Sequence, residues 1–247
     1  MNEYADLLTR VERVETGPGS GRQKPRDAST LVLLDRSGAE PRVLMGRRHE
    51  RHVFIPDKFV FPGGSVDAAD RRMAAAGALD PDSERRLMAR MSHPYPVRAR
   101  AIALAAIRET LEETGLLLGN PMRETFKPPS PAWTAFAQAG VRPDLSALTF
   151  VVRAITPPGR SRRFDTRFFL ADRSAVAAEI ADTVGPDSEF VELKWLTFAE
   201  AEAGNLPTIS KVVLAEVTAR LKAGPQAQLP VPFYYWKSDR FRREEIE

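Results

Sequence analysis

The chain lacks cysteine altogether among its 247 residues. This absence excludes disulfide bonds and thiol nucleophiles, and it fits a reducing compartment. Long hydrophobic runs are missing too, and residues 1–6 lack the basic-then-apolar order of a secretory signal. We therefore expect a cytoplasmic protein with no membrane partner.

Excess charge of one sign is also lacking. The 36 Lys and Arg residues nearly balance the 33 Asp and Glu residues, and a net charge of +3 is too small to indicate nucleic-acid binding. The three histidines, His49, His52 and His93, show no metal-ligand spacing. With 43% hydrophobic residues, a chain of this length can bury one sizeable core, so we expect one decorated domain rather than two.

Carboxylates are concentrated in the segment 108–116, which reads Arg-Glu-Thr-Leu-Glu-Glu-Thr-Gly-Leu. Glu109, Glu112 and Glu113 stand at positions i, i+3 and i+4, so a helix brings them to one side. Their mutual repulsion would be relieved by a hard divalent cation such as Mg²⁺, which binds few protein oxygens and leaves room for water and phosphate. The alternative is a solvent-exposed acidic helix in which Arg108 pairs with Glu112.

A glycine pair interrupts a predicted strand upstream. The segment 59–67 reads Phe-Val-Phe-Pro-Gly-Gly-Ser-Val-Asp, which is typical of a strand breaking into a loop. Gly63 and Gly64 allow the backbone to approach another group closely and to present N–H groups to an anion. The alternative is an ordinary turn.

Together these segments resemble the Nudix box of the Nudix hydrolases. The family pattern places Gly, five residues and Glu before Arg-Glu-U-x-Glu-Glu-x-Gly-U, where U is bulky and apolar. Here Gly64, Asp70 and residues 108–116 match, with Asp70 in place of Glu and Thr110 in place of U. Thirty-seven residues, 71–107, stand where the pattern has seven. Long insertions in surface loops cost little, so we interpret about 71–97 as a helical insertion.

An insertion at this point resembles the branch of the peroxisomal coenzyme A diphosphatases. The segments 25–34, 163–170 and 189–196 resemble strands of that branch, and the resemblance runs from about residue 26 to about residue 222. It implies an α/β fold, namely an α/β/α sandwich with a mixed sheet. We predict an N-terminal tail over 1–27, a Nudix domain over 28–224 and an extension over 225–247.

The local patterns predict the elements of this domain. Strands are expected at about 29–36, 42–47, 58–62, 147–155, 164–171 and 189–196. Helices are expected at about 98–114, 133–139, 197–203 and 208–222, and Gly115 is expected to end the first of them as a left-handed cap. The aromatic run 233–236 is expected to pack on the domain; a homodimer contact or a base-stacking surface is the alternative.

The resemblance also implies roles for the box residues. Glu109, Glu112 and Glu113 would bind Mg²⁺ or Mn²⁺, and Arg108 would orient them. Asp70 is a candidate minor ligand, with a loop-capping carboxylate as the even alternative. Glu113 is the first candidate for the general base. Two acids near the late strand, Glu189 and Glu192, are the other candidates.

Substrate contacts are assigned to the glycine pair and to four arginines, Arg47, Arg48, Arg163 and Arg167. For each arginine the alternative is a solvated surface charge. The implied activity is hydrolysis of the pyrophosphate linkage in a nucleoside diphosphate joined to another group, with coenzyme A or acyl-coenzyme A as the leading substrate. ADP-ribose, NADH and other nucleotide sugars are alternatives. A Nudix-fold ligand sensor without catalysis is the alternative from another class.

Overall fold

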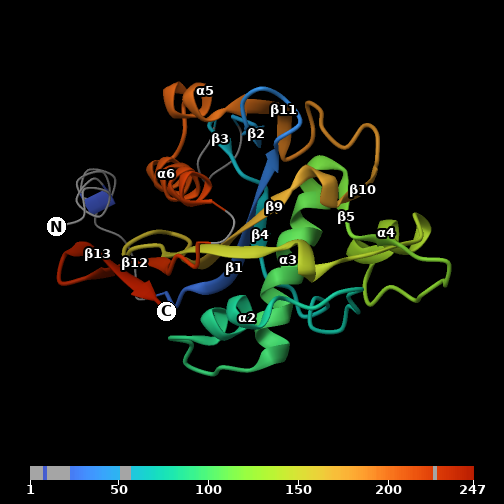
Figure 1. The fold of residues 1–247 in the computed structure, drawn as a ribbon, viewed down its shortest axis with the longest axis horizontal. Coiled ribbons are helices and arrows are strands. Elements are labelled where there is room, and N and C mark those ends of the chain that lie inside the picture. The colour runs from blue at the N-terminus through green and yellow to red at the C-terminus, as the bar shows by residue number, and fades with distance from the viewer. Residues whose placement is uncertain (1–7, 10–22, 51–56, 225–226) are drawn as a thin grey trace.

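The computed structural model describes residues 8–9, 23–50, 57–224 and 227–247. Most of the predicted tail over 1–27 therefore lies outside the described residues. Figure 1 shows a central sheet with helices on both sides. No helix among the described residues has the length and apolar character needed to cross a membrane.

The sheet is mixed and has the strand order β11-β2-β1-β9-β8-β12-β13. Strand β1 pairs in parallel with β9, and β12 pairs in parallel with β8, whereas the other neighbours are antiparallel. Two short strands, β3 and β4, pair with β2 and β1. The bounds are β1 Arg26–Asp35, β2 Arg42–Arg48, β3 Phe59–Val60, β4 Gly63–Ser65, β8 Thr149–Ile155, β9 Phe164–Asp172, β11 Phe190–Thr197, β12 Val231–Lys237 and β13 Arg240–Ile246.

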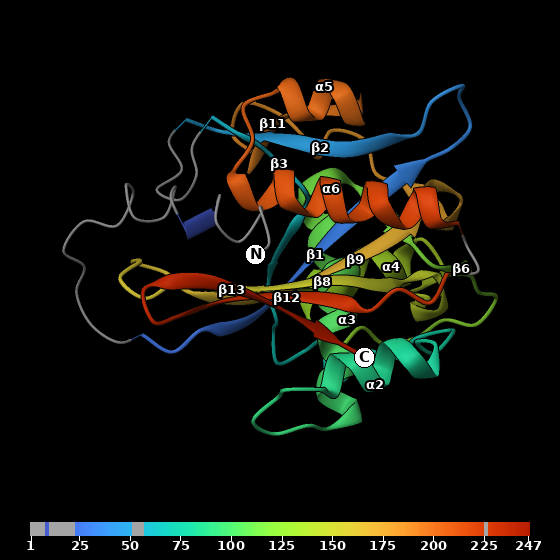
Figure 2. The same ribbon diagram turned by 60° about the vertical axis from the view of Figure 1, so that its left-hand side comes forward.

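Helices cover both faces of this sheet, as β1 illustrates. Its side chains alternate between two hydrophobic clusters because successive residues of a strand point to opposite faces. Leu31 and Leu33 pack with residues of α3 (Pro96–Thr114), whereas Val32 and Leu34 pack with residues of α6 (Thr208–Ala223). Figure 2 shows α3 and α6 on opposite sides of the sheet, with α5 (Phe198–Ala203) beside α6. The predicted α/β/α sandwich is confirmed.

The long interval inside the box folds as a helix and loops beneath the sheet. Helix α2 (Pro81–Met88) begins after Asp80, whose carboxylate accepts the N–H groups of Asp82 and Ser83. Leu87 is buried and joins α2 to the cluster around α3. The chain then enters α3, which ends at Gly115 with a φ of 77°. The left-handed cap predicted from the sequence is confirmed.

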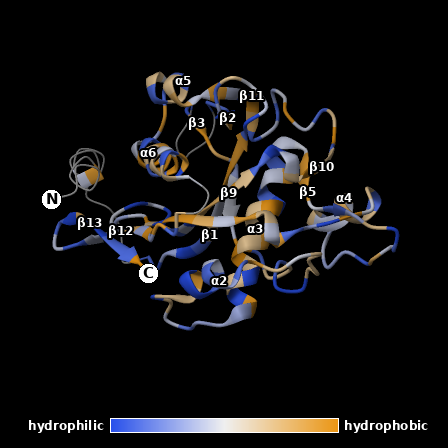
Figure 3. Cartoon of the chain, viewed as in Figure 1, coloured by the Kyte–Doolittle hydropathy of each residue, from blue (hydrophilic) through white to orange (hydrophobic). Residues whose placement is uncertain are grey.

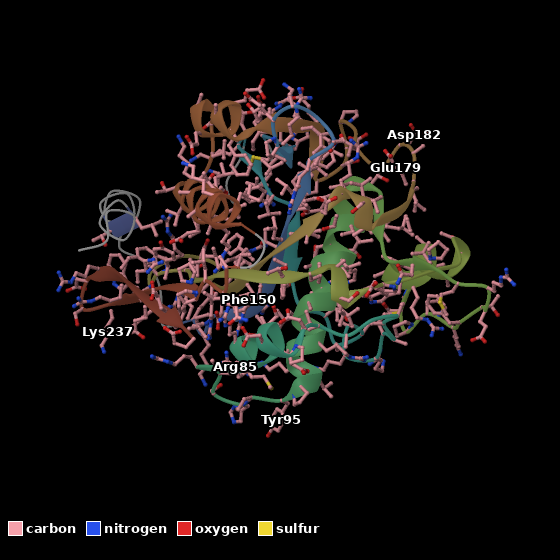
Figure 4. All side chains as sticks on the ribbon, viewed as in Figure 1. Arg85, Tyr95, Phe150, Glu179, Asp182 and Lys237 are labelled. Atoms are coloured by element: carbon pink, nitrogen blue, oxygen red, sulfur yellow. The ribbon has the colours of Figure 1, made fainter. Side chains whose placement is uncertain are left out.

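The C-terminal segment forms a hairpin for which no strands were predicted. Strand β12 pairs with β8 through Phe233 and Tyr234, and β13 pairs with β12 along its whole length. Tyr234 is fully buried and its hydroxyl donates to Glu216 Oε1 at 2.6 Å. Figure 4 shows Lys237 at the outer end of this hairpin, whereas Phe150 lies in the centre of the molecule. The aromatic run 233–236 therefore continues the sheet.

Short helices, 3-10 turns and short strands complete the fold. The predicted helix at 133–139 is present as the short α4 (Thr134–Gln138) after a 3-10 turn at Pro131–Trp133. Two further 3-10 turns span Leu145–Ala147 and Arg173–Ala175. The remaining short strands are β5 (Leu116–Leu118), β6 (Asn120–Pro121), β7 (Val141–Arg142) and β10 (Val176–Glu179). Figure 3 shows hydrophobic residues along β1, β9 and α3, whereas β13 is mostly hydrophilic.

Candidate active site

Arg108 organises the acidic turn of α3. Its Nε and Nη2 donate to Asp70 at 2.8 and 3.1 Å, and its Nη1 donates to Glu109 and Glu112 at 2.8 Å each. Nη2 also donates to the backbone oxygen of Ser65 at 2.9 Å. Burial alone would lower the pKa of Arg108, but its hydrogen bonds to Asp70 and the surrounding negative charges raise it. The guanidinium therefore stays charged and holds its three acidic partners in place.

Asp70 lies behind the glutamates rather than beside them. Its side chain is fully buried, and both of its oxygens accept hydrogen bonds from Arg108. The backbone N–H of Asp67 donates to the same carboxylate at 2.8 Å, which makes Asp70 a loop-capping group. These contacts are those of a loop cap, and a role for Asp70 as a minor metal ligand stays a prediction. Asp70 does not line the neighbouring cavity.

Glu109 and Glu113 meet Gly63 and Gly64, the glycine corner, at a cavity of about 330 Å³. The N–H of Gly63 donates to Glu113 Oε2 at 2.9 Å. A Cβ on Gly64 would lie 2.5 Å from Glu109 Oε2, so only glycine allows this approach. We call this space, which all four residues line, the corner cavity. The structure thus brings together two segments about fifty positions apart in the chain.

The two carboxylates on this wall are held in an unfavourable electrostatic setting. Burial raises the pKa of Glu109 to about 7, although Arg108 opposes the shift. Burial also raises the pKa of Glu113 well above its ordinary value, and the negative charges of Glu189 and Glu109 add to that effect. Buried carboxylates that repel one another are stabilised by a cation.

The carboxylate oxygens at this cavity are suitable ligands for Mg²⁺ and Mn²⁺. Both ions prefer carboxylate oxygens, and the wall of the corner cavity offers the oxygens of Glu109 and Glu113. Glu112 is held by Arg108, has a side chain that is 40% exposed and does not line the cavity. Accordingly, no group of three or more His, Cys, Asp or Glu side chains in the described part of the chain is already arranged to hold a metal ion.

The two late acids occupy different places. Glu189 lines the corner cavity and pairs with Arg48, which lines it as well. Glu192 lies outside it, where Lys194 and Arg47 contact its oxygens at 2.8 and 3.1 Å and lower its pKa through hydrogen bonds. The structure therefore brings Glu189, and not Glu192, to the candidate site.

The other predicted arginine contacts separate in the same way. Arg47 pairs with Asp57 and Glu192 outside the cavity. Arg167 is fully buried and donates to Asp27 at 2.8 Å, so it cannot reach a substrate in the corner cavity. 

Arg163 is also held by other groups of the protein. It donates to the backbone oxygens of Gln23, Thr156 and Pro157 and thereby ties a loop to the start of β1. None of Arg47, Arg163 and Arg167 lines the corner cavity, because other groups of the protein hold them elsewhere.

Sequence reasoning missed several residues of the cavity wall. Alternate residues in the first half of β9, from Phe164 to Phe168, face it, and Arg162 lines it just before that strand. The period-two pattern of β9 could have revealed this face once one of its residues was known to face the site. The missed residues include Thr30, Phe61, Arg162, Phe164, Thr166 and Phe168.

Known proteins share this architecture. No protein-family model matches the chain. Its structure is similar to the crystal structure of a Nudix hydrolase from Alicyclobacillus acidocaldarius, with a TM-score of 0.61 and 29% identity over 81% of this chain and 94% of that chain. The resemblance to the Nudix hydrolase superfamily is confirmed. The acidic turn of α3 and the glycine corner thus resemble a Nudix box interrupted by an insertion.

Three curated relatives of this chain carry one name. Acyl-coenzyme A diphosphatase NUDT19 of Gallus gallus is 33% identical over 179 residues, which are 52% of this chain and 47% of that protein. The protein of that name from Homo sapiens is 26% identical over 226 residues, which are 70% of this chain and 56% of that protein. The chain spans about half the length of the curated relatives it matches. The resemblance to the coenzyme A diphosphatase branch is confirmed at this level of identity.

Proposed function

We propose that this protein is a divalent-metal-dependent hydrolase that cleaves the pyrophosphate linkage of coenzyme A or acyl-coenzyme A. The observation that carries the proposal is the meeting of Glu109, Glu113 and the glycine corner at one cavity. The name shared by the curated relatives supports the choice of substrate. ADP-ribose, NADH and other nucleotide sugars contain the same linkage and are the alternatives.

Glu109 and Glu113 would hold Mg²⁺ or Mn²⁺, with Glu112 available at the edge of the turn. When bound, such an ion neutralises charge on the phosphate oxygens and lowers the pKa of a water ligand. Arg108 acts by positioning, because it holds Glu109 and Glu112 at 2.8 Å each. 

Phosphoryl transfer asks the protein chiefly to position groups and to balance charge. Arg48 lies on the cavity wall, where a guanidinium can bind a phosphate oxygen. Glu189 lies on the same wall and, together with Glu113, is a candidate to accept the proton of the attacking water. The aromatic side chains Phe61, Phe164 and Phe168 give the cavity an apolar side that can contact the organic part of a substrate.

Purified protein should be incubated with Mn²⁺ or Mg²⁺ and, separately, with coenzyme A, an acyl-coenzyme A, ADP-ribose, NADH and a diadenosine polyphosphate. We expect mass spectrometry to find cleavage at the pyrophosphate of the coenzyme A compounds, and none after chelation of the metal. Faster cleavage of another compound would identify that compound, and not coenzyme A, as the preferred substrate. Tight binding of one of them without cleavage would favour a ligand sensor.

A further inference from the structure

A second cavity, of about 620 Å³, adjoins the corner cavity. The two share Ser65, Arg162 and Phe164 in their walls. Among the described residues that line the second cavity none is acidic, and four are basic. We call this space the basic cavity; its other lining residues are Gln23, Lys24, Arg26, Ser161 and Arg163.

The paired strands β1 and β9 connect the two cavities. Arg26 of β1 lines the basic cavity, whereas Ala28 and Thr30 line the corner cavity, and residues two apart in a strand face the same side. Their partners in β9 follow the same order, with Phe164 opposite Arg26 in the register and lining both cavities. The cavities are therefore two ends of one trough.

The spacing along this trough is short. Gly64 pairs with Ser29, and Arg26 stands three residues further along β1. At ~3.3 Å per residue the basic end begins roughly 10 Å beyond the glycine corner. A ribose separates its own 3′- or 2′-phosphate from the 5′-diphosphate by a distance of this order.

The basic groups at this end carry uncompensated charge. Arg163 is occupied with backbone oxygens and fixes the loop before β9. No ion pair within the described residues engages Lys24, Arg26 or Arg162, and each is exposed. Guanidinium groups in a concave surface of one sign attract phosphate.

We propose that the basic cavity binds a phosphomonoester on the ribose of the substrate, next to the diphosphate held at the glycine corner. This inference rests on the proposed function, which supplies the position of the diphosphate. It narrows the substrate class to nucleoside diphosphate derivatives with an additional ribose phosphate, such as coenzyme A with its 3′-phosphate or NADPH with its 2′-phosphate. Compounds without that phosphate bind less tightly.

The first test is turnover of matched substrates. We expect kcat/KM for coenzyme A to exceed that for 3′-dephospho-coenzyme A by about tenfold or more, since a hydrogen bond to a charged group is of that strength. Arg162→Ala should reduce the ratio to about threefold or less, because it slows coenzyme A more than 3′-dephospho-coenzyme A. NADPH and NADH form the second pair, which distinguishes a 2′-phosphate from a 3′-phosphate. Arg26→Gln provides a second variant, and unchanged unfolding midpoints would show that both variants fold.

The control is Arg240→Ala, which removes the same charge from an exposed arginine of the C-terminal hairpin. It should leave the ratio of the two kcat/KM values as it is in the unmodified protein. An equal loss in Arg240→Ala and Arg162→Ala would mean that net charge, and not the basic cavity, sets the preference. That result would overturn the inference.

The second test is calorimetric titration with adenosine 3′,5′-bisphosphate and with 5′-AMP, which needs no turnover. We expect the bisphosphate to bind at least tenfold more tightly, and Arg162→Ala to abolish the difference. If the bisphosphate binds more tightly in this way but no substrate is hydrolysed, the phosphate site in the basic cavity is supported and the proposed activity is refuted. Hydrolysis without phosphate preference, together with equal or unmeasurable binding of the two nucleotides, would refute the basic cavity and leave the proposed activity standing.

Discussion

Replacing Gly64 with alanine tests whether turnover depends on the close approach of the glycine corner to α3. The added Cβ would lie 2.5 Å from Oε2 and 2.6 Å from Oε1 of Glu109. Gly64 has no positive φ, so alanine introduces no backbone strain there. The substitution therefore acts on the position of one carboxylate.

The size of the effect follows from these distances. Ordinary van der Waals contact begins at 3.4 Å, so the carboxylate of Glu109 must move by about 0.9 Å. A misplacement of ~1 Å in a catalytic group can cost about 10²-fold in rate. We expect kcat/KM to fall by about two orders of magnitude, which is ~2.7 kcal/mol of transition-state stabilisation.

The assay is steady-state hydrolysis of the best substrate with Mn²⁺, together with thermal unfolding. Gly38→Ala is the matched control, since the nearest atom to its Cβ is 3.8 Å away in an exposed turn. It should keep turnover and stability within error. Gly64→Ala turnover within threefold of the unmodified protein would refute the idea that Glu109 must be held at this corner.

Three other substitutions test the charges around the site. Glu113→Gln should lower turnover by orders of magnitude yet raise the unfolding midpoint in chelator, because it removes a buried charge that its neighbours repel. Glu192→Gln should reduce turnover much less, because this side chain lies outside the corner cavity. Asp27→Asn should cost about 3 kcal/mol of unfolding free energy at pH 7 and less at pH 3. Burial favours a higher pKa for Asp27, but Arg98 and Arg167 outweigh it and lower the pKa. The ionised carboxylate therefore stabilises the fold above about pH 3.8, and this stabilisation is lost as the pH falls through the pKa of the folded state.

Each of these predictions has an outcome that would contradict it. Turnover near normal in Glu113→Gln would remove that residue from the catalytic centre. A larger loss in Glu192→Gln than in Glu113→Gln would move the base to the late strand. For Asp27→Asn, an energy difference that is the same at pH 7 and pH 3 would show that the ionised carboxylate contributes nothing beyond its packing.

The predictable part of the fold was carried by strong local signals. The apolar spacing over 98–114 and Gly115 defined α3 almost to the residue, because helical periodicity and a left-handed cap are both local properties. The C-terminal hairpin was missed for the opposite reason. Pro232 interrupts the strand pattern of β12, charged residues dominate β13, and the pairing with β8 joins segments far apart in the sequence.

At the candidate site, the sequence indicated which residues carry the chemistry better than which arginines surround them. Glu109 and Glu113 stand one turn apart on α3, and the pairing of β4 with β1 holds the glycines against that turn. The spacing could not show which arginines reach the cavity, as Arg162 and Arg167 illustrate. Neighbouring positions in and before a strand face opposite sides, and Arg167 points to a half-buried partner, Asp27, that is 140 positions away.

The most direct test of the central claim is an anomalous difference map from crystals of the protein grown with Mn²⁺. We predict a peak in the corner cavity, within coordination distance of Glu109 and Glu113 and beside Gly63. Full turnover in chelator, or Mn²⁺ bound only at sites remote from these carboxylates, would contradict the account.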